Sequence, residues 1–283
     1  MRHGDGVGDS ELDAFNAFEA TGWERQAGTY GDVVGCVTSR LVDPLLDAAG
    51  VGPGRRVLDL ATGPGYAAAA AVARGADVVA VDVAPAMVEL ARRLHPGLDV
   101  RQADAEALPF RDADFDAAVS NFVVPHLGRH DRAVAELVRV LRPGGCLALT
   151  TWDTPDRARL QGVFLEAFAA AGAGTPAELR AGPPFFRYAD EGLFTELLED
   201  AGLIEIHVRT VAFDHEVASP NELWDGMLGG TVRTSALLLA QPNDVQAQAR
   251  AAFDRRVEDY RRGDHFELPI SVKLAAGQKP TAD

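Results

Sequence analysis

The sequence predicts an α/β protein whose mostly parallel sheet is covered by helices on both faces. Short apolar segments alternate with segments in which apolar residues recur at helical spacing. An acidic residue lies at the end of each of the first three apolar segments, at Asp59, Asp82 and Asp104. A glycine-rich turn, Gly63-Pro64-Gly65, follows the first of them. Strands that alternate with helices form parallel sheets, and both faces of such sheets are buried.

The composition narrows the class of protein. The chain has 283 residues, of which 47% are hydrophobic, so it can bury one large α/β core with insertions. Its formal net charge of -15 disfavours nucleic acid as a partner, because basic residues supply most of the affinity for phosphate groups. No apolar run is long enough for a membrane span, and residues 1–15 lack the apolar segment of a signal peptide. We therefore expect a cytoplasmic monomer or homodimer that acts on a small molecule, without a membrane partner.

The first half of the chain contains five expected strands, and apolar runs place them at 57–60, 78–81, 100–103, 115–123 and 146–152. The expected helices between them are an alanine-rich segment at 66–74, a segment at 85–94 that begins with proline, and a segment that carries the stripe Val134, Leu137, Val138 and Leu141. The last of these helices is expected to end at Pro143-Gly144-Gly145.

The pattern is looser after Trp152. Helices are expected at 160–171, after an Asp190 N-cap, after the capping box that begins at Ser219, and from Asn243 onward. Ile204, Ile206 and Val208 alternate as a sixth strand, and the apolar parity then changes to Val211 and Phe213, which predicts a bulge or a bend. The last strand covers 268–274, and Pro269 predicts that it starts there or lies at the sheet edge.

The glycine turn and the three acids predict a nucleoside-binding site. Gly63 to Ala68 fits the pattern G-x-G-x-x-A, and Asp82 follows at the spacing of an acid that binds a ribose diol, so a dinucleotide such as NAD is one candidate. Pro64 removes an N–H donor that a pyrophosphate needs. Asp59 would repel a pyrophosphate, but it would attract the ammonium and sulfonium groups of S-adenosylmethionine.

Each acid also has a structural alternative. Asp59 could brace the loop, Asp82 could cap the following helix, and Asp104, proposed to accept a hydrogen bond from an adenine amino group, could be a solvated turn residue. The two cysteines, Cys36 and Cys146, lack the spacing of metal ligands, so we expect reduced, buried thiols and no metal site.

Five segments together resemble the class I S-adenosylmethionine-dependent methyltransferases. The motifs are V-L-D-L-A-T-G-P-G at 57–65, V-A-V-D at 79–82, Q-A-D-A-E-A-L-P-F at 102–110, F-D-A-A-V-S-N at 115–121 and L-R-P-G-G at 141–145. Their order is similar to the type 11 methyltransferase-domain subgroup, which includes ubiquinone and menaquinone biosynthesis enzymes and bacterial natural-product methyltransferases. The resemblance covers residues 51–152 firmly, and the closing strand pair more loosely.

The resemblance implies a Rossmann-like, seven-stranded, mostly parallel sheet with an antiparallel last strand. It divides the chain into a helical N-terminal lid (1–50), a cofactor-binding core (51–153) and a remainder (154–283). The remainder contains strands near 204–216 and 266–277 and two cap insertions, 155–187 and 217–263. The implied cofactor is S-adenosylmethionine, with S-adenosylhomocysteine as product.

The resemblance also implies the cofactor-binding residues. Asp82 would bind the ribose hydroxyls, Asp104 and Ala105 the adenine, and Met87 would pack on the adenine ring. The full set comprises Tyr30, Asp59, Ala61, Thr62, Gly63, Gly65, Asp82, Val83, Met87, Asp104, Ala105, Asn121 and Phe122. Ala61 stands where the family most often has a glycine, and alanine fits there if its φ is negative.

The resemblance implies methyl transfer to O, N or C of a small molecule in bacterial secondary metabolism. His126, after the fourth strand, is the candidate base, and a packing or capping role is its alternative. Phe186, Trp224 and Met227 are candidates for an apolar substrate pocket, or else for helix packing. Arg233 or Arg187 is the candidate partner of an acidic substrate group.

Three other functions share parts of this pattern. The same fold and cofactor can serve a cyclase or decarboxylase without methyl transfer. An NAD-linked oxidoreductase is disfavoured by Pro64 and Asp59. A non-catalytic binding protein is disfavoured by the intact acids at three strand ends.

Overall fold

The computed structural model describes residues 8–176, 179–180 and 182–281. The helices are α1 (Asp9–Gln26), α2 (Val34–Ser39), α3 (Val42–Ala48), α4 (Tyr66–Ala73), α5 (Pro85–Leu94), α6 (His130–Val140), α7 (Arg159–Ala170), α8 (Glu191–Asp200), α9 (Pro220–Gly230), α10 (Arg233–Leu239) and α11 (Asn243–Val257). The strands are β1 (Arg56–Leu60), β2 (Asp77–Asp82), β3 (Asp99–Gln102), β4 (Phe115–Asn121), β5 (Leu141–Trp152), β6 (Ile204–Val217), β7 (Arg261–Arg262) and β8 (His265–Gln278).

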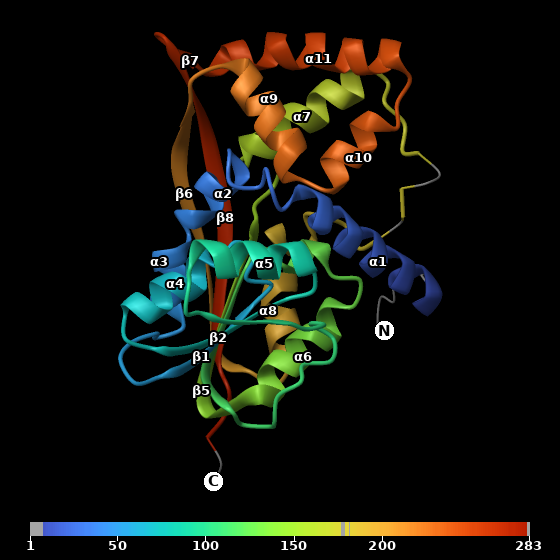
Figure 1. Cartoon of the computed structure of the whole chain (residues 1–283). Coiled ribbons are helices and arrows are strands. Elements are labelled where there is room, and N and C mark those ends of the chain that lie inside the picture. Colours follow the sequence, from blue (N-terminus) through green and yellow to red (C-terminus); the bar gives the residue numbers. More distant parts are fainter. Residues whose placement is uncertain (1–7, 177–178, 181, 282–283) are drawn as a thin grey trace.

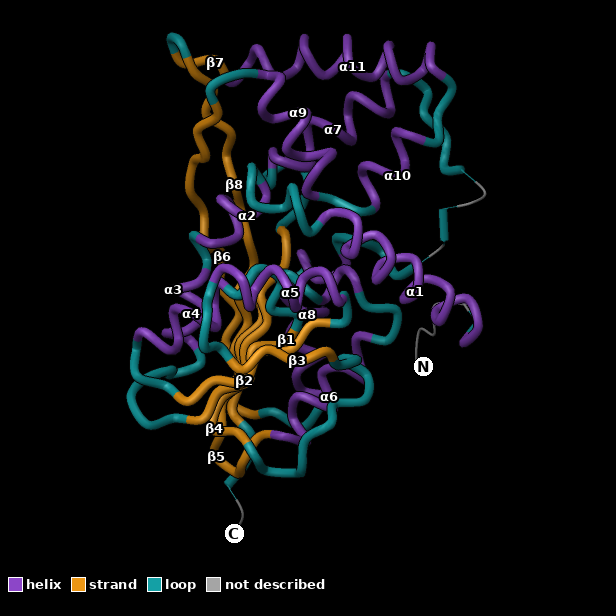
Figure 2. The backbone as a smooth tube through the Cα atoms, in the orientation of Figure 1, coloured by secondary structure: helices purple, strands orange, loops and turns teal. Residues whose placement is uncertain are grey.

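The sheet confirms the predicted Rossmann-like fold class. Seven strands follow the order β3-β2-β1-β4-β5-β8-β6, and the two-residue β7 pairs with β8 outside this path. The first five strands pair in parallel, whereas β8 runs antiparallel to both β5 and β6. Helices α3, α4 and α5 cover one face of the sheet, and α6 and α8 cover the other. Figure 2 shows this strand bundle between its helices.

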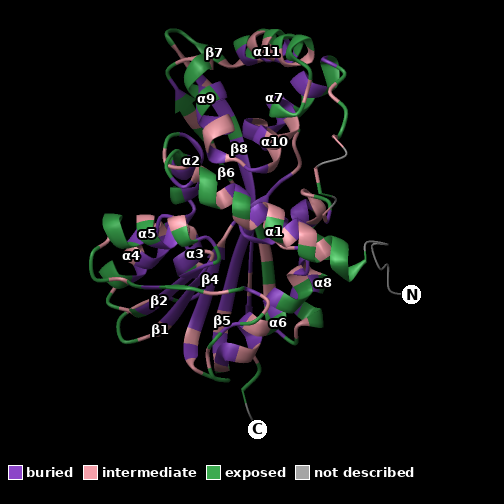
Figure 3. Ribbon diagram, turned by 45° about the vertical axis from the view of Figure 1, so that its right-hand side comes forward, coloured by how far each residue is buried: buried purple, intermediate pink, exposed green. Residues whose placement is uncertain are grey.

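A helical cap stands above the carboxyl ends of the parallel strands. It consists of α7, α9, α10 and α11, whose apolar side chains share one hydrophobic cluster with α2. In Figure 1, β6 and β8 rise from the core into this cap, and α1 lies at the junction between the two. Figure 3 shows that the central strands are buried, while α11 exposes its outer face. No described helix is long and apolar enough to cross a membrane.

Of the predicted bulge or bend in the middle of β6, the bulge is wrong. The pairing of β6 with β8 is regular from His207 to Val217, and the register shift lies earlier, between Ile204 and His207. Val208 packs against the core cluster under α8, whereas Val211 and Phe213 pack against the cap cluster. The core covers one face of β6 and the cap covers the opposite face further along the same regular strand. The apolar residues therefore change from one face to the other along the strand.

Pro269 lies at an edge position, as predicted, although β8 as a whole lies between β5 and β6. The pairing of β8 with β5 covers only Val272–Gln278, so Pro269 lies beyond it and pairs with Asp214 of β6 on one side. A proline is tolerated there because its nitrogen needs no partner on the unpaired side.

The expectation of buried thiols is also wrong. Cys36 is exposed on α2, and Cys146 is partly exposed at the start of the regular part of β5. Both cysteines are free. The Sγ atom of Cys36 donates to the carbonyl oxygen of Gly31, 3.2 Å away.

Candidate active site

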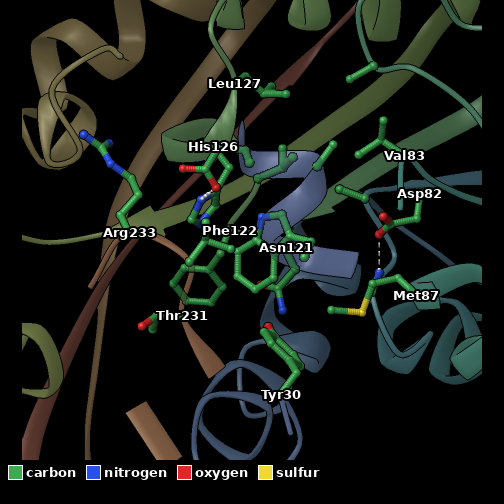
Figure 4. A pocket seen from close by; sticks show the side chains of 18 of the residues that line it. Tyr30, Asp82, Val83, Met87, Asn121, Phe122, His126, Leu127, Thr231 and Arg233 are labelled. Carbon is green, nitrogen blue, oxygen red and sulfur yellow. Dashed lines mark hydrogen bonds and ion pairs between the residues drawn. The ribbon is translucent and has the colours of Figure 1, made fainter. Parts of the chain in front are cut away.

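A cavity of about 350 Å³ lies where the carboxyl ends of β1, β2 and β4 meet α1 and the cap. Its walls come from α1, from the loops that follow β1 to β4, and from the segment between α9 and α10. Figure 4 shows Asp82, Val83 and Met87 on one side of Asn121 and Phe122, with His126 and Arg233 on the other. We call these sides the cofactor half and the acceptor half.

The loop after β1 is shaped by left-handed backbone conformations. Gly63 and Gly65 have φ values of 52° and 87°, which only glycine adopts without steric cost. Ala61 has a φ of 54°, so the condition of a negative φ, under which alanine fits without cost, is not met. An alanine in this region costs roughly 1–2 kcal/mol. The backbone therefore keeps the turn that a glycine would make, at the price of local strain.

Asp82 joins the loop to the floor of the cofactor half. One carboxylate oxygen accepts the backbone N–H of Gly63 at 2.9 Å, and the other accepts that of Ala84 at 3.0 Å. Asp82 lines the cavity although it is only 7% exposed. Burial raises the pKa of Asp82 to about 6, and the backbone hydrogen bonds oppose this shift. The residue therefore both holds the turn before α5 and faces the space for a nucleoside.

Asp59 has the bracing role that was its alternative. Its Oδ2 accepts the hydroxyl of Thr62 at 2.6 Å and the backbone N–H of Ala68 at 3.0 Å. Burial raises its pKa to about 7. Asp59, Thr62 and Gly65 are not among the residues that line the cavity. The structure thus places these three behind the loop rather than against the cofactor space, because Asp59 turns toward the first turn of α4.

The remaining predicted cofactor residues meet at the cavity wall. Ala61, Val83, Met87, Asp104 and Ala105 all line it. Asp104 is exposed, and its Oδ1 accepts the backbone N–H of Glu106 at 2.9 Å. Its Oδ2 therefore stays available to a ligand while the turn holds the side chain in place.

Tyr30, Asn121 and Phe122 lie between the two halves (Figure 4). The Tyr30 hydroxyl is 3.1 Å from the hydroxyl of Thr38, and burial raises the pKa of Tyr30 to about 12. Asn121 donates to the Thr38 carbonyl at 3.0 Å and accepts the Thr150 hydroxyl at 2.6 Å. These bonds fix the side chains of Tyr30 and Asn121, and the Phe122 ring packs on Trp152 with ring centroids 4.3 Å apart. The φ of Phe122 is 63°, a strained left-handed value.

His126 lies in the acceptor half beside a buried carboxylate that the sequence did not reveal. Its Nδ1 is 3.0 Å from Oε2 of Glu19, on α1. Glu19 is 3% exposed and lines the cavity with His126. The rings of Trp23 and Phe185 contact the imidazole edge-on, with centroids 5.0 and 5.6 Å away. The signal in the sequence was helical spacing, since Glu19 lies one turn from both Phe15 and Trp23, on an otherwise apolar face of α1.

Arg233 also lines the acceptor half, and in Figure 4 its guanidinium points away from His126. Its guanidinium lies 5.4 Å from the ring centroid of Phe15 and 5.7 Å from that of Phe185. Burial lowers the pKa of Arg233, and the charge of Glu19 opposes this shift. Arg187, the alternative partner for an acidic group, is not among the lining residues.

The structure does not bring the three predicted apolar substrate residues to the cavity. Trp224 and Met227 are buried in the cap cluster, where the Trp224 ring stacks on Phe164 at 5.4 Å. Phe186 packs against the same cluster, and its neighbour Phe185 lines the cavity instead. Both faces of α9 carry apolar residues, so the sequence pattern could not distinguish packing from substrate contact. Within the described residues, no group of three or more His, Cys, Asp and Glu forms a metal site.

A family model described as a methyltransferase domain matches residues 58–149, which span β1 to β5 and so include the cofactor half. An uncharacterized protein of Mycobacterium bovis is 34% identical over 191 residues, which are 63% of this chain and 68% of that protein. A demethylmenaquinone methyltransferase of Renibacterium salmoninarum is 37% identical over 122 residues, 43% of this chain and 52% of the relative. The chain belongs to the class I S-adenosylmethionine-dependent methyltransferases. It spans about half the length of this demethylmenaquinone methyltransferase.

Among solved structures, the [4+2]-cyclase SpnF shares the fold of this methyltransferase-family chain. The two align with a TM-score of 0.51 and 23% identity, over 86% of this chain and 82% of the cyclase. At this identity the likeness concerns the fold alone. The name of that protein shows that the fold also occurs in an enzyme with a different reaction.

Proposed function

We propose that this protein transfers the methyl group of S-adenosylmethionine to a small molecule held in the acceptor half. The observation that carries the proposal is the shared cavity. Asp82, Asp104 and Ala105 line the same space as His126 and Arg233, with Asn121 and Phe122 between them. Methyl transfer needs this arrangement, because donor and acceptor must lie in line and away from water.

The residues of the cofactor half fit S-adenosylmethionine. Each carboxylate oxygen of Asp82 accepts one backbone N–H, which leaves lone pairs free for ribose hydroxyls. Asp104 and the backbone of Ala105 would hold the adenine, and the buried Met87 would pack on its ring. The cofactor supplies a methyl group that its sulfonium already activates. The chain therefore has to bind, orient and exclude water.

An NAD-linked reaction has less support in the loop geometry. Pro64 has no N–H, and the N–H of Gly63 already donates to Asp82. A pyrophosphate would find few donors there. A cyclase or decarboxylase remains the alternative, and the fold of SpnF is consistent with it. The proposal includes a cytoplasmic monomer or homodimer in bacterial secondary metabolism, as the resemblance to natural-product methyltransferases suggests.

Calorimetric titration with S-adenosylhomocysteine, with NADH in parallel, tests the cofactor. We expect one-to-one binding of S-adenosylhomocysteine and none of NADH. Asp82→Asn should weaken binding about 10- to 100-fold, because hydrogen bonds to a charged group are lost. Asp77→Asn is the matched control, since Asp77 lies at the other end of β2 and is 66% exposed at its side chain. Binding of NADH but not of S-adenosylhomocysteine would overturn the proposal.

Analysis of the reaction products separates methyl transfer from the alternative. We expect S-adenosylhomocysteine to accumulate together with a product that has gained one methyl group. A product of unchanged or smaller mass, formed while S-adenosylmethionine is not consumed, would establish a cyclase or decarboxylase.

A further inference from the structure

We infer that the acceptor is an aromatic hydroxy acid, whose hydroxyl oxygen takes the methyl group beside His126 and Glu19 while its acidic group pairs with Arg233. This inference rests on the proposed methyl transfer and adds the class of substrate. Three features of the acceptor half carry it: a histidine oriented by a carboxylate, two buried acceptors without donors, and a half-buried guanidinium without a carboxylate.

Glu19 holds His126 in the tautomer that a base needs. Its Oε2 lies 3.0 Å from Nδ1 of the imidazole, so Nδ1–H donates to the carboxylate and Nε2 keeps its lone pair. Glu19 comes from α1 and His126 from the short turn at Val124–His126 after β4, 107 residues later. Glu19 is thus a positioning residue, and His126 is the group that meets the acceptor proton.

Two oxygen acceptors in the cavity wall lack donors. Oε1 of Glu19 and Oε1 of Gln161 are buried and have no hydrogen-bond partner among the described residues. Both residues are more than nine-tenths buried and line the cavity. An unsatisfied buried acceptor costs about 1–3 kcal/mol, so such groups point to a ligand that donates. A single ligand hydroxyl can supply a donor to one of these two acceptors.

Arg233 offers the complementary group. Its one hydrogen bond among the described residues is a 3.5 Å contact from Nη1 to the carbonyl oxygen of Pro183, and no described carboxylate lies within 4.0 Å. Arg233 is half-buried, and the planar donors of a guanidinium match a carboxylate. The ligand therefore carries an acidic group in addition to its hydroxyl.

The walls between these polar groups are aromatic. Trp23, Phe122, Trp152 and Phe185 line the cavity, and Phe185 contacts both the imidazole of His126 and the guanidinium of Arg233. Flat rings pack favourably on such side chains in offset or edge-to-face geometry. An aromatic ring that carries both substituents fills this space without leaving its own polar atoms unpaired.

The reaction balances without another reagent. The hydroxyl proton passes to Nε2 of His126, and the oxygen forms a bond to the methyl carbon as the carbon–sulfur bond breaks. S-adenosylhomocysteine and a methyl ether result. The imidazolium is stabilised by Glu19 until its proton is released to solvent.

The test uses the protein loaded with S-adenosylhomocysteine and two probe acids, 4-hydroxybenzoate and the two-ring 4'-hydroxybiphenyl-4-carboxylate. Each has a counterpart that lacks the hydroxyl and one in which an amide replaces the acid. We expect at least one hydroxy acid to bind about 10-fold or more tightly than both of its counterparts, because charged hydrogen bonds are lost in each. The absorption spectrum of this hydroxy acid should shift on binding toward that of its phenolate form, and we call this shift the phenolate signal.

Variants separate the roles. His126→Gln should abolish the phenolate signal and slow methylation of the probe about 100-fold or more. Glu19→Gln should keep binding of the acid but weaken the phenolate signal, and Glu19→Asp should restore part of it. Arg233→Gln should reduce binding of the acid to that of its amide. Arg255→Gln, exposed on α11, is the control for charge and should change none of these results.

The inference is overturned if S-adenosylhomocysteine binds but both hydroxy acids bind no better than their counterparts. It is equally overturned if Arg233→Gln affects acid and amide alike, or if the phenolate signal persists in His126→Gln. Failure of S-adenosylhomocysteine to bind would instead count against the proposed function itself. Affinity for S-adenosylhomocysteine also reports whether each variant is folded.

Discussion

The two halves of the cavity are built in different ways. The cofactor half is assembled from the ends of neighbouring strands, so Ala61, Asp82 and Asp104 each lie close in sequence to a strand that positions them. The acceptor half brings together Glu19, His126 and Arg233 from three distant segments. Cofactor residues depend on local chain geometry, whereas acceptor residues depend on how α1 and the cap pack on the core. Perturbing the packing should therefore affect the second half more than the first.

The largest effect on the free energy of unfolding is expected from Trp224→Ala. Trp224 packs between Phe164 and Phe253 in the cap cluster, and truncation of a buried aromatic side chain costs about 3–5 kcal/mol. Urea unfolding should show this loss, while affinity for S-adenosylhomocysteine stays within a few-fold at a temperature where the variant is folded. Leu239→Ala, whose side chain is exposed, should lose much less stability. If Trp224→Ala weakened cofactor binding as much as stability, the two halves would not be separable.

Asp59→Asn tests the buried charge behind the cofactor loop. Burial raises the pKa of Asp59 from an ordinary value of 3.8 to about 7 in the folded protein. At a pH between these two values, the protein therefore takes up a proton at Asp59 when it folds. Its contribution to stability is full below pH 3.8 and is lost as pH rises through about 7, by about 1.4 kcal/mol per pH unit at most.

The measurement is the difference in unfolding free energy between wild type and Asp59→Asn from pH 4 to 8. Wild type should lose stability relative to the variant up to pH 7, and the difference should then level off. Asp77→Asn supplies the control for an exposed carboxyl. A difference that does not vary with pH would mean that burial does not govern this carboxyl.

Gly22→Ala tests the close approach of α1 to the cap. A Cβ atom at Gly22 would lie 2.2 Å from Cγ1 of Val232, so α1 has to move away from the segment before α10. Overpacking of this kind costs about 1–3 kcal/mol. Because Glu19 lies on α1 and Arg233 follows Val232, binding of the hydroxy acid should weaken more than binding of S-adenosylhomocysteine. Gly28→Ala, with open space at its Cβ position, should change neither affinity.

The smallest effect on stability is expected from Ala61→Gly. Glycine removes roughly 1–2 kcal/mol of left-handed strain, but the greater backbone entropy of the unfolded chain costs about 0.5–1 kcal/mol, so the net gain is between about 0 and 1.5 kcal/mol. Thermal unfolding and titration with S-adenosylhomocysteine measure it. Ala113→Gly, at a φ of 57° away from the cavity, should gain similar stability without a change in affinity. Equal changes in affinity for both variants would rule out a role of the Ala61 strain at the site.

The sequence by itself determined most of the core. Apolar periodicity placed five parallel strands, and the glycine turn with three acids indicated a nucleoside site, because the carboxyl ends of adjacent parallel strands meet at one edge. The same local information could not distinguish Asp59 as a brace from Asp82 as a cavity residue. Both end a strand, and the difference lies in which way the side chain turns.

Only the tertiary structure decided the acceptor half. Hydrophobicity shows that a face of α9 is buried, but not what buries it, so Trp224 and Met227 were expected at the substrate and lie in the cap core instead. In β6 the apolar residues change face because the core packs on one face of this regular strand and the cap packs on the other. The meeting of Glu19 with His126 joins residues 107 positions apart, and no local pattern encodes such a contact. It arises because α1 must bury Phe15 and Trp23, and this packing carries Glu19 into the cavity.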